Sequence, residues 1–351
     1  MQMVVLASVA SDKGENLMKI LITAPQNQIF PRYFPQHVLD QLHAMGEVVL
    51  NPYDRNFTRE ELAKALEDAE VVITHWGTPQ MTGDMLDRAP KLKLMAHGAG
   101  TVAHIASEAF YEREIPVLSA NAIMAESVAE AVMGYLIAAA HKMLQLDQLT
   151  RADQWENKTT ATRQKSLLGC DVGLIGLGTI ARRLLDMLAP FRCRVHVYDP
   201  YAKREQLDQW PFAELCDFET AMSQPFVSIH AAQTPETYHI IDAQALGLMP
   251  DDGILINSSR GSLVDTDALI TELKTGRIYA VLDVYEQEGT GKVPKELLSL
   301  TKNTLLQPHM ACAPVTWEMT QGIVDDVRRY LNNEPLQLQV SLQQYRLMTQ
   351  E

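Results

Sequence analysis

The chain has 351 residues, of which 46% are hydrophobic and 21% charged, and its formal net charge is −14. This composition is ordinary for a folded globular protein, and the length predicts two domains at roughly 150 residues per domain. The acidic balance argues against nucleic acid or an anionic membrane as the main partner, because both need a basic face. A small anionic substrate stays open, since it needs only a local positive site.

The cysteine pattern and the N-terminus indicate a reduced intracellular environment. The four cysteines form no CxxC pair and have no metal-ligand spacing, so we expect free thiols and no metal site. The apolar run near the N-terminus is too short to span a membrane and follows no basic residue. We interpret residues 1–17 as a leader of uncertain order and expect a cytoplasmic protein without a transmembrane span.

The first third of the chain alternates short apolar runs with segments of helical period. Continuous apolar runs predict parallel strands that are covered on both faces, and the alternation predicts an α/β fold. Residues 58–69 predict a helix that places Leu62, Ala65 and Leu66 on one face. The predicted strands are residues 19–23, 47–50, 70–74, 92–96 and 115–118.

The alternation stops at one long helix and then restarts. Residues 121–144 are Ala-rich and apolar on most sides, which predicts a helix buried between layers, and residues 150–166 predict a loop. The six strands predicted after this loop lie in the segments DVGLIG, CRVHVYD, PFVSIHA, DGILINS, IYAVLDV and NTLLQP. The tail from about residue 314 predicts a single amphipathic helix and no strand, and we expect it to pack on the first domain.

A glycine-rich turn opens the second set of strands. Gly176, Gly178 and Ala181 form a G-x-G-x-x-A pattern between a predicted strand and a predicted helix. Such a turn lets the backbone approach a pyrophosphate at a helix N-terminus. Asp199 ends the next strand and is the expected partner of a ribose 2′-hydroxyl, which favours NAD over NADP. The basic residues 203–204 keep NADP open, and a purely structural glycine turn is the alternative.

Polar residues follow three further strands of the same predicted sheet. Arg260 follows one strand, Asp283 and Glu288 follow the next, and His309 follows the last. Parallel sheets bind ligands beyond the carboxyl ends of their strands. Arginine can hold a carboxylate in bidentate fashion, and histidine is the natural proton donor near neutral pH. Each residue alone could be structural, but together they predict a site for reducing a keto acid.

These motifs together resemble the D-isomer-specific 2-hydroxyacid dehydrogenases. The resemblance covers about residues 18–336, and its most specific stretches are SVAEAVMGYLIA, LLGCDVGLIGLGTIA, LINSSRGSLVDTDALI, AVLDVYEQE and PHMA. It implies two Rossmann-like lobes with parallel sheets, in which a cofactor domain (121–312) is inserted into a discontinuous catalytic domain (18–120 and 313–345). It also implies a homodimer, for which the helix at 121–144 is a plausible element.

The resemblance assigns a role to each matching residue. Arg260 orients the substrate carboxylate, His309 is the acid/base, and Glu288 pairs with that histidine. Ala99 and Gly100 match the loop whose amides hold the carboxylate, and His75 and Trp76 are further candidates for substrate binding. The residues expected at the cofactor are Gly176, Gly178, Thr179, Ile180, Asp199, Thr237, Ser258 and Asp283, the last beside the nicotinamide carboxamide.

The chain departs from the family pattern near the pocket. Ala311 and Cys312 stand where glycines are usual after the histidine, Gly289 where a proline usually follows the glutamate, and Val102 where an aspartate is common. His75 and Trp76 occupy the region where phosphoglycerate dehydrogenases carry an arginine, which favours a small or apolar-tailed 2-keto acid. The alternative function is an NAD(H)-sensing, corepressor-like binding protein without turnover.

Overall fold

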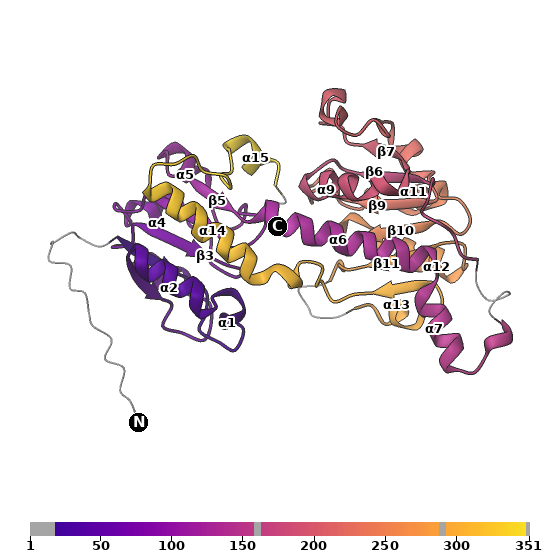
Figure 1. Ribbon diagram of the computed structural model, residues 1–351, viewed down its shortest axis with the longest axis horizontal. Helices are drawn as coiled ribbons and strands as arrows, with labels where there is room; N and C mark the ends of the chain where they lie inside the picture. Colours follow the sequence, from indigo (N-terminus) through magenta and orange to yellow (C-terminus); the bar gives the residue numbers. More distant parts are fainter. Residues whose placement is uncertain (1–17, 158–162, 288–292, 349–351) are drawn as a thin grey trace.

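The computed structural model describes residues 18–157, 163–287 and 293–348, which form two lobes, each built on a parallel sheet (Figure 1). The first sheet has the strand order β2-β1-β3-β4-β5, and the second has the order β12-β11-β10-β9-β6-β7-β8. The predicted α/β class with two parallel sheets is therefore confirmed. The strands of the first sheet are β1 (Lys19–Ile22), β2 (Glu47–Leu50), β3 (Val71–Thr74), β4 (Leu94–His97) and β5 (Val117–Ser119).

The second sheet contains seven strands, one more than predicted. The extra strand, β8 (Ala213–Leu215), lies at the sheet edge beside β7, and its three residues contain no apolar run that could have marked it. The others are β6 (Asp171–Ile175), β7 (Arg194–Tyr198), β9 (Phe226–Ile229), β10 (Ile254–Asn257), β11 (Tyr279–Leu282) and β12 (Thr304–Leu306).

Helices cover both faces of the first sheet. The segment predicted over 58–69 forms α3 (Arg59–Leu66), whose buried residues are Leu62, Ala63 and Leu66. Ala65 is partly buried and packs against the same core cluster, so the predicted face is confirmed, and Ala63 extends it. The other helices here are α1 (Phe30–Tyr33), α2 (Gln36–Met45), α4 (Gly83–Asp87) and α5 (Glu108–Glu112).

The C-terminal segment returns to the first lobe, as predicted. Helix α14 (Thr316–Leu331) lies against that lobe in Figure 1 and buries Met319 and Ile323 in its core. The prediction of a single helix was wrong beyond that point, whereas no strand follows β12 in the described part of the chain. Gln339 forms an antiparallel bridge with Leu118, and a short helix, α15 (Leu342–Arg346), follows.

The long apolar helix is shorter than predicted. Helix α6 (Asn121–Ala140) runs from the first lobe into the second, and a break at Lys142 separates it from α7 (Met143–Arg151) (Figure 1). Lys142 adopts a left-handed conformation with φ of 51° and places its ammonium 4.3 Å from the centre of the Tyr279 ring. Helix α7 also occupies the start of the segment predicted as a loop.

Helix α6 is the one helix among the described residues that is long and apolar enough to cross a membrane. In this fold 44% of its apolar stretch is buried, and it packs along α9 and under β10. The remaining helices of the second lobe are α9 (Thr179–Leu188), α10 (Phe218–Met222), α11 (Ala243–Leu248), α12 (Thr266–Lys274) and α13 (Lys295–Ser299).

Candidate active site

The strands of the second sheet end in register. Ile175 pairs with both Tyr198 and Ile229, and Asn257 pairs with both Ile229 and Leu282. Leu282 in turn pairs with Leu306. The residues that follow these strands therefore leave the sheet along one edge, which is where parallel sheets bind ligands. They include Gly176, Asp199, Ser258, Asp283 and Gln307. Gln307 lies two positions before His309.

The glycine turn has the geometry that the sequence predicts. Gly176 has a φ of 101°, and a Cβ there would lie 2.7 Å from the backbone nitrogen of Ala231. Gly178 precedes the first turn of α9, and a Cβ there would meet only the His230 carbonyl oxygen, at 3.8 Å. The positive φ and the nearby Ala231 backbone make glycine necessary at position 176. The open space at Gly178 lets a ligand approach the backbone there.

Asp199 supports the glycine turn directly. Its Oδ2 accepts a hydrogen bond from the Leu177 backbone N–H at 2.8 Å, and its Oδ1 accepts one from Tyr201 at 2.9 Å. Each carboxylate oxygen can accept more than one hydrogen bond, so both can still receive a hydroxyl. Asp199 therefore shapes the turn in addition to the ribose-binding role expected from the sequence.

The arrangement around the turn fits a bound dinucleotide. Thr179 and Ile180 form the first turn of α9, where backbone N–H groups have no partner within the helix. The Ser258 hydroxyl is buried and has no hydrogen-bond partner among the described residues, so it is a donor available to a ligand. The Thr237 hydroxyl differs, because it donates to the Ala232 carbonyl at 2.7 Å and so holds its own loop together.

Arg260 is positioned by its backbone. Its carbonyl accepts a hydrogen bond from the Asn257 side chain at 2.8 Å, and its guanidinium donates to the Ser259 carbonyl at 2.8 Å. A Cβ on the next residue, Gly261, would lie 1.9 Å from the carbonyl carbon of Tyr285. The loop that carries Arg260 therefore lies in close contact with the loop that follows β11.

Asp283 organises the turn that carries His309. Its side chain is 1% exposed, and its two oxygens accept hydrogen bonds from the backbone N–H groups of Met310 (3.1 Å) and Ala311 (3.3 Å). His309 itself is exposed and has a φ of 54°, a left-handed conformation that non-glycine residues rarely adopt. The buried carboxylate thus fixes the backbone immediately after the histidine, a role that the sequence alone did not indicate.

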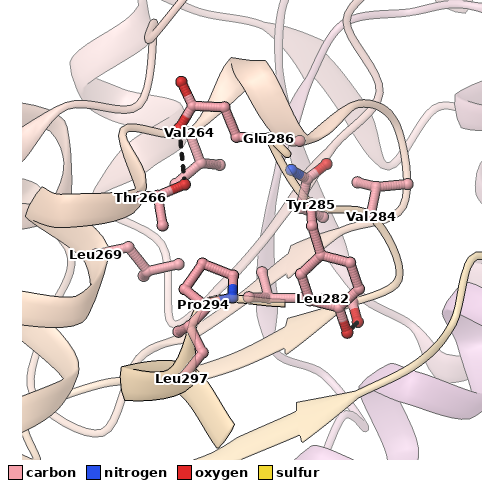
Figure 2. Close-up of a pocket in the computed structure, with 11 residues that line it drawn as sticks. Val264, Thr266, Leu269, Leu282, Val284, Tyr285, Glu286, Pro294 and Leu297 are labelled. Atoms are coloured by element: carbon pink, nitrogen blue, oxygen red, sulfur yellow. Dashed lines mark hydrogen bonds between the residues drawn. The ribbon is translucent and has the colours of Figure 1, made fainter. Parts of the chain in front are cut away.

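Glu288, the expected partner of His309, lies outside the described residues. Its neighbour Glu286 is described, and it accepts a hydrogen bond from His239 at 2.7 Å. It accepts a second one from Thr266 at 2.8 Å, which is drawn in Figure 2. Burial disfavours ionisation of Glu286, but the bonds from His239 and Thr266 outweigh it and lower the pKa of this carboxyl. Glu286 therefore joins the loop after β11 to His239 and to the start of α12, and its partner is His239 and not the predicted acid/base His309.

The first lobe contributes a second set of loops, which follow β3 and β4. His75 is buried, and Trp76 beside it is 40% exposed. Ala99 and Gly100 are buried, and the Ser119 hydroxyl donates to the Ala99 carbonyl at 3.2 Å. A Cβ on Gly98 would lie 3.1 Å from the His75 ring, so the two loops lie against each other.

The N-terminus of α6 connects these loops to the glycine turn. The Asn121 side-chain amide donates to the Thr179 hydroxyl at 3.3 Å. A Cβ on Gly100 would lie 3.7 Å from Asn121 Oδ1 and 2.5 Å from the Met124 side chain. One helix end therefore contacts both the predicted carboxylate loop and the predicted pyrophosphate site, which the sequence separates by about eighty residues.

Cys312 has the environment of a packing residue. It is half-buried, and burial raises the pKa of its thiol, so the nucleophilic thiolate is disfavoured. The Ser127 hydroxyl of α6 donates to the preceding Ala311 carbonyl at 2.9 Å. Ala311 and Cys312 thus attach the His309 turn to α6.

Replacing Gly176 by alanine should weaken NADH binding at least about tenfold, because a Cβ would strain the left-handed turn and strike Ala231. Fluorescence titration with NADH measures this. Gly247→Ala is the matched control, because nothing lies within 4 Å of a Cβ there. Equal NADH affinity of the two variants would contradict the role given to Gly176.

Asp283→Ala should lower the free energy of unfolding by about 1.5–3 kcal/mol, the value of hydrogen bonds to a charged group that are lost. The Met310 and Ala311 N–H groups would lose their acceptor. Urea denaturation provides the measurement, with the exposed Asp208→Ala as control. Equal destabilisation by both substitutions would show that Asp283 does not hold the turn.

The protein should lose stability as the pH falls from about 7 to about 5. Burial lowers the pKa of His75 to about 3 and that of His97 well below its ordinary value, so the folded protein keeps both neutral. The unfolded chain takes up these protons near pH ~6.5, and each histidine then costs about 1–2 kcal/mol of stability over this range. Unfolding midpoints measured across this pH range should depend less on pH in His97→Gln than in the wild-type protein. The exposed His43→Gln should keep the wild-type pH dependence. A wild-type pH dependence in His97→Gln would contradict the burial of His97 as a neutral group.

Comparison with known proteins assigns the chain to the same family that its sequence motifs resemble. Residues 133–311 match the D-isomer specific 2-hydroxyacid dehydrogenase, NAD binding domain. The chain is 32% identical to glyoxylate reductase of Thermococcus gammatolerans, over 86% of this chain and 90% of that protein. It is 30% identical to D-3-phosphoglycerate dehydrogenase of Methanocaldococcus jannaschii over 91% of this chain, but spans only 58% of that protein's length.

The fold has the same relatives. A crystal structure of a Pyrococcus horikoshii protein superposes with a TM-score of 0.77 at 24% identity, covering 94% of this chain and 96% of that one. This likeness extends over both lobes, and the sequence matches include the glycine turn and the segments that carry Arg260 and His309. The chain belongs to the D-isomer-specific 2-hydroxyacid dehydrogenases and is an NAD-dependent oxidoreductase of that type.

Proposed function

We propose that the protein interconverts a 2-keto acid and a D-2-hydroxy acid. The observation that carries this proposal is the common strand-end register, which brings the Arg260 loop, Asp283 and the His309 turn to the sheet edge that holds the glycine turn. Relatives named glyoxylate reductase and hydroxypyruvate reductase support reduction of a keto acid.

Each residue then has a defined task. The guanidinium of Arg260 and the amides near Ala99 and Gly100 bind the substrate carboxylate. NADH supplies a hydride to the carbonyl carbon when it is bound. His309 donates a proton to the carbonyl oxygen, and Glu288 orients the imidazole and favours its protonated form. In the reverse direction, neutral His309 removes the hydroxyl proton.

The cofactor residues extend this proposal. The amides of Thr179 and Ile180 face the pyrophosphate, the Ser258 hydroxyl is available to the cofactor, and Asp283 lies near the nicotinamide carboxamide. Asp199 accepts the ribose 2′-hydroxyl, and its charge would repel a 2′-phosphate. Thr237 supports the loop beside them through its bond to Ala232.

We further propose a cytoplasmic homodimer. The homodimer is supported by helix α6, whose apolar stretch is 44% buried within one chain. The cytoplasmic location is supported by the four cysteines, which are free. Tyr135, Ile137 and Ala138 of this 20-residue helix are only partly buried within one chain, and a second copy of the chain would cover them.

His309→Ala should lower kcat by about 10²–10⁴-fold, the usual contribution of general acid catalysis. The affinity for NADH should change less than about twofold, because the Gly176 turn is untouched. The measurements are steady-state NADH oxidation and a fluorescence titration with NADH.

The exposed His43→Ala serves as the matched control and should keep wild-type kcat. A near-normal kcat in His309→Ala would remove the histidine from the mechanism. If the wild-type protein binds NADH but oxidises it with no 2-keto acid tested, the reductase proposal fails and a sensing role replaces it. Running the same substrates with NADPH tests the cofactor preference.

A further inference from the structure

A pocket in the first lobe has no role in the mechanism above. It lies between the loop after β1, helix α1 and the loop after β3, and has a volume of about 160 Å³. Its wall includes Ile29, Phe30, Tyr33, His75 and Trp76, and two amides, Asn27 and Asn56, also line it. The pocket is therefore concave, mostly apolar and built around aromatic rings.

The rings of this wall support one another. The ring centres of Tyr33 and His75 are 4.0 Å apart, those of His75 and Trp76 are 4.5 Å apart, and those of Tyr33 and Trp76 are 5.6 Å apart. Phe30 stacks on Phe34 at 5.0 Å. Aromatic rings packed at 4.5–7 Å attract one another and favour a further ring at similar spacing.

The pocket adjoins both predicted ends of the substrate. On one side, the His75 ring lies against Gly98, which directly precedes the carboxylate loop at Ala99 and Gly100. On the other side, helix α1, which carries Tyr33, packs against α14, the helix that follows the His309 turn. In Figure 1, α1 lies nearer to the second lobe than α2 does. A keto acid held at these two points would direct its side chain toward the pocket.

The charge of the pocket excludes an anionic side chain. No lysine or arginine is among its lining residues, all of which lie in the described part of the chain. Burial lowers the pKa of His75 to about 3, so this histidine is neutral at physiological pH. A phosphorylated or carboxylated tail would lose its hydration here without gaining a cation.

The size of the pocket indicates which neutral side chain fits. A cavity of about 150 Å³ lined by apolar residues is large enough to bind benzene. Glyoxylate has no side chain, and the hydroxymethyl group of hydroxypyruvate is small and polar, so neither would fill this space.

We infer that the preferred substrate is a 2-keto acid with an aromatic side chain, of the phenylpyruvate type. The inference rests on the proposed reductase function and adds a binding site for the part of the substrate that does not react. Ile29, Phe30, Tyr33 and Trp76 contact the aryl ring, and the reacting carbonyl lies between Arg260 and His309.

The first experiment compares kcat/KM of the wild-type protein with NADH for phenylpyruvate, 4-methyl-2-oxopentanoate, hydroxypyruvate and glyoxylate. Phenylpyruvate should exceed glyoxylate by at least about tenfold, since even one methylene in an apolar pocket changes kcat/KM by about 10–200-fold. Equal or higher values for glyoxylate would overturn the inference but leave the reductase proposal intact. Absence of turnover on all four would instead reject the reductase proposal.

Two substitutions locate the effect in the pocket. Trp76→Ala removes one wall, and Ile29→Trp adds bulk at a residue that is 43% exposed and outside the core. Each should lower the ratio of kcat/KM for phenylpyruvate to that for glyoxylate at least about fivefold. Trp155→Ala, at a residue 63% exposed in the second lobe, should keep the wild-type ratio. Unchanged ratios in both pocket variants would overturn the assignment.

A binding measurement separates the pocket from catalysis. NADH and a 2-hydroxy acid cannot react with each other, so the two together probe binding alone. D-3-phenyllactate with NADH should raise the melting temperature more than D-lactate with NADH does, and Trp76→Ala should abolish the difference. Equal shifts for the two hydroxy acids in the wild-type protein would contradict the inference.

Discussion

The site depends on one constraint, which is that the parallel strands of the second sheet end at the same level. Backbone pairing aligns Ile175, Ile229, Asn257, Leu282 and Leu306 across the sheet. Each following residue must then leave the sheet along one edge, so side chains from distant parts of the sequence meet without any direct bond between them. A shift of one strand by a single residue would turn its side chains to the opposite face and displace the loop that it carries.

Two buried contacts convert this alignment into a defined geometry. Asp283 accepts N–H bonds from the turn after His309, and Gly261 presses the Arg260 loop against Tyr285. Glu286, in the loop after β11, also accepts hydrogen bonds from His239 and from Thr266 at the start of α12, and Figure 2 shows the bond from Thr266. Buried carboxylates need hydrogen-bond donors, and the backbone and side-chain groups of these loops provide them. The residues that orient the site are thus also residues that stabilise it.

Much of this was predictable from the sequence. Apolar runs mark buried parallel strands, and strand ends mark where polar side chains meet, so the Gly176 turn, Arg260 and His309 could be placed together. The edge strand β8 could not, because three residues with one buried side chain show no periodicity. The helix break at Lys142 and the bridge from Gln339 to Leu118 depend on tertiary contacts. The aromatic pocket could not be predicted from the sequence for the same reason, since Tyr33 and His75 are forty-two residues apart in the chain.

The central claim is that a keto acid held by Arg260 receives its hydride on one face while His309 protonates the oxygen. Such a fixed arrangement gives a product of one handedness, because the carbonyl cannot turn over between Arg260 and the first-lobe amides. The most direct test is chiral analysis of the hydroxy acid formed from phenylpyruvate and NADH. We predict only the D-enantiomer of 3-phenyllactate. A racemic product or the L-enantiomer would contradict the geometry proposed for this site.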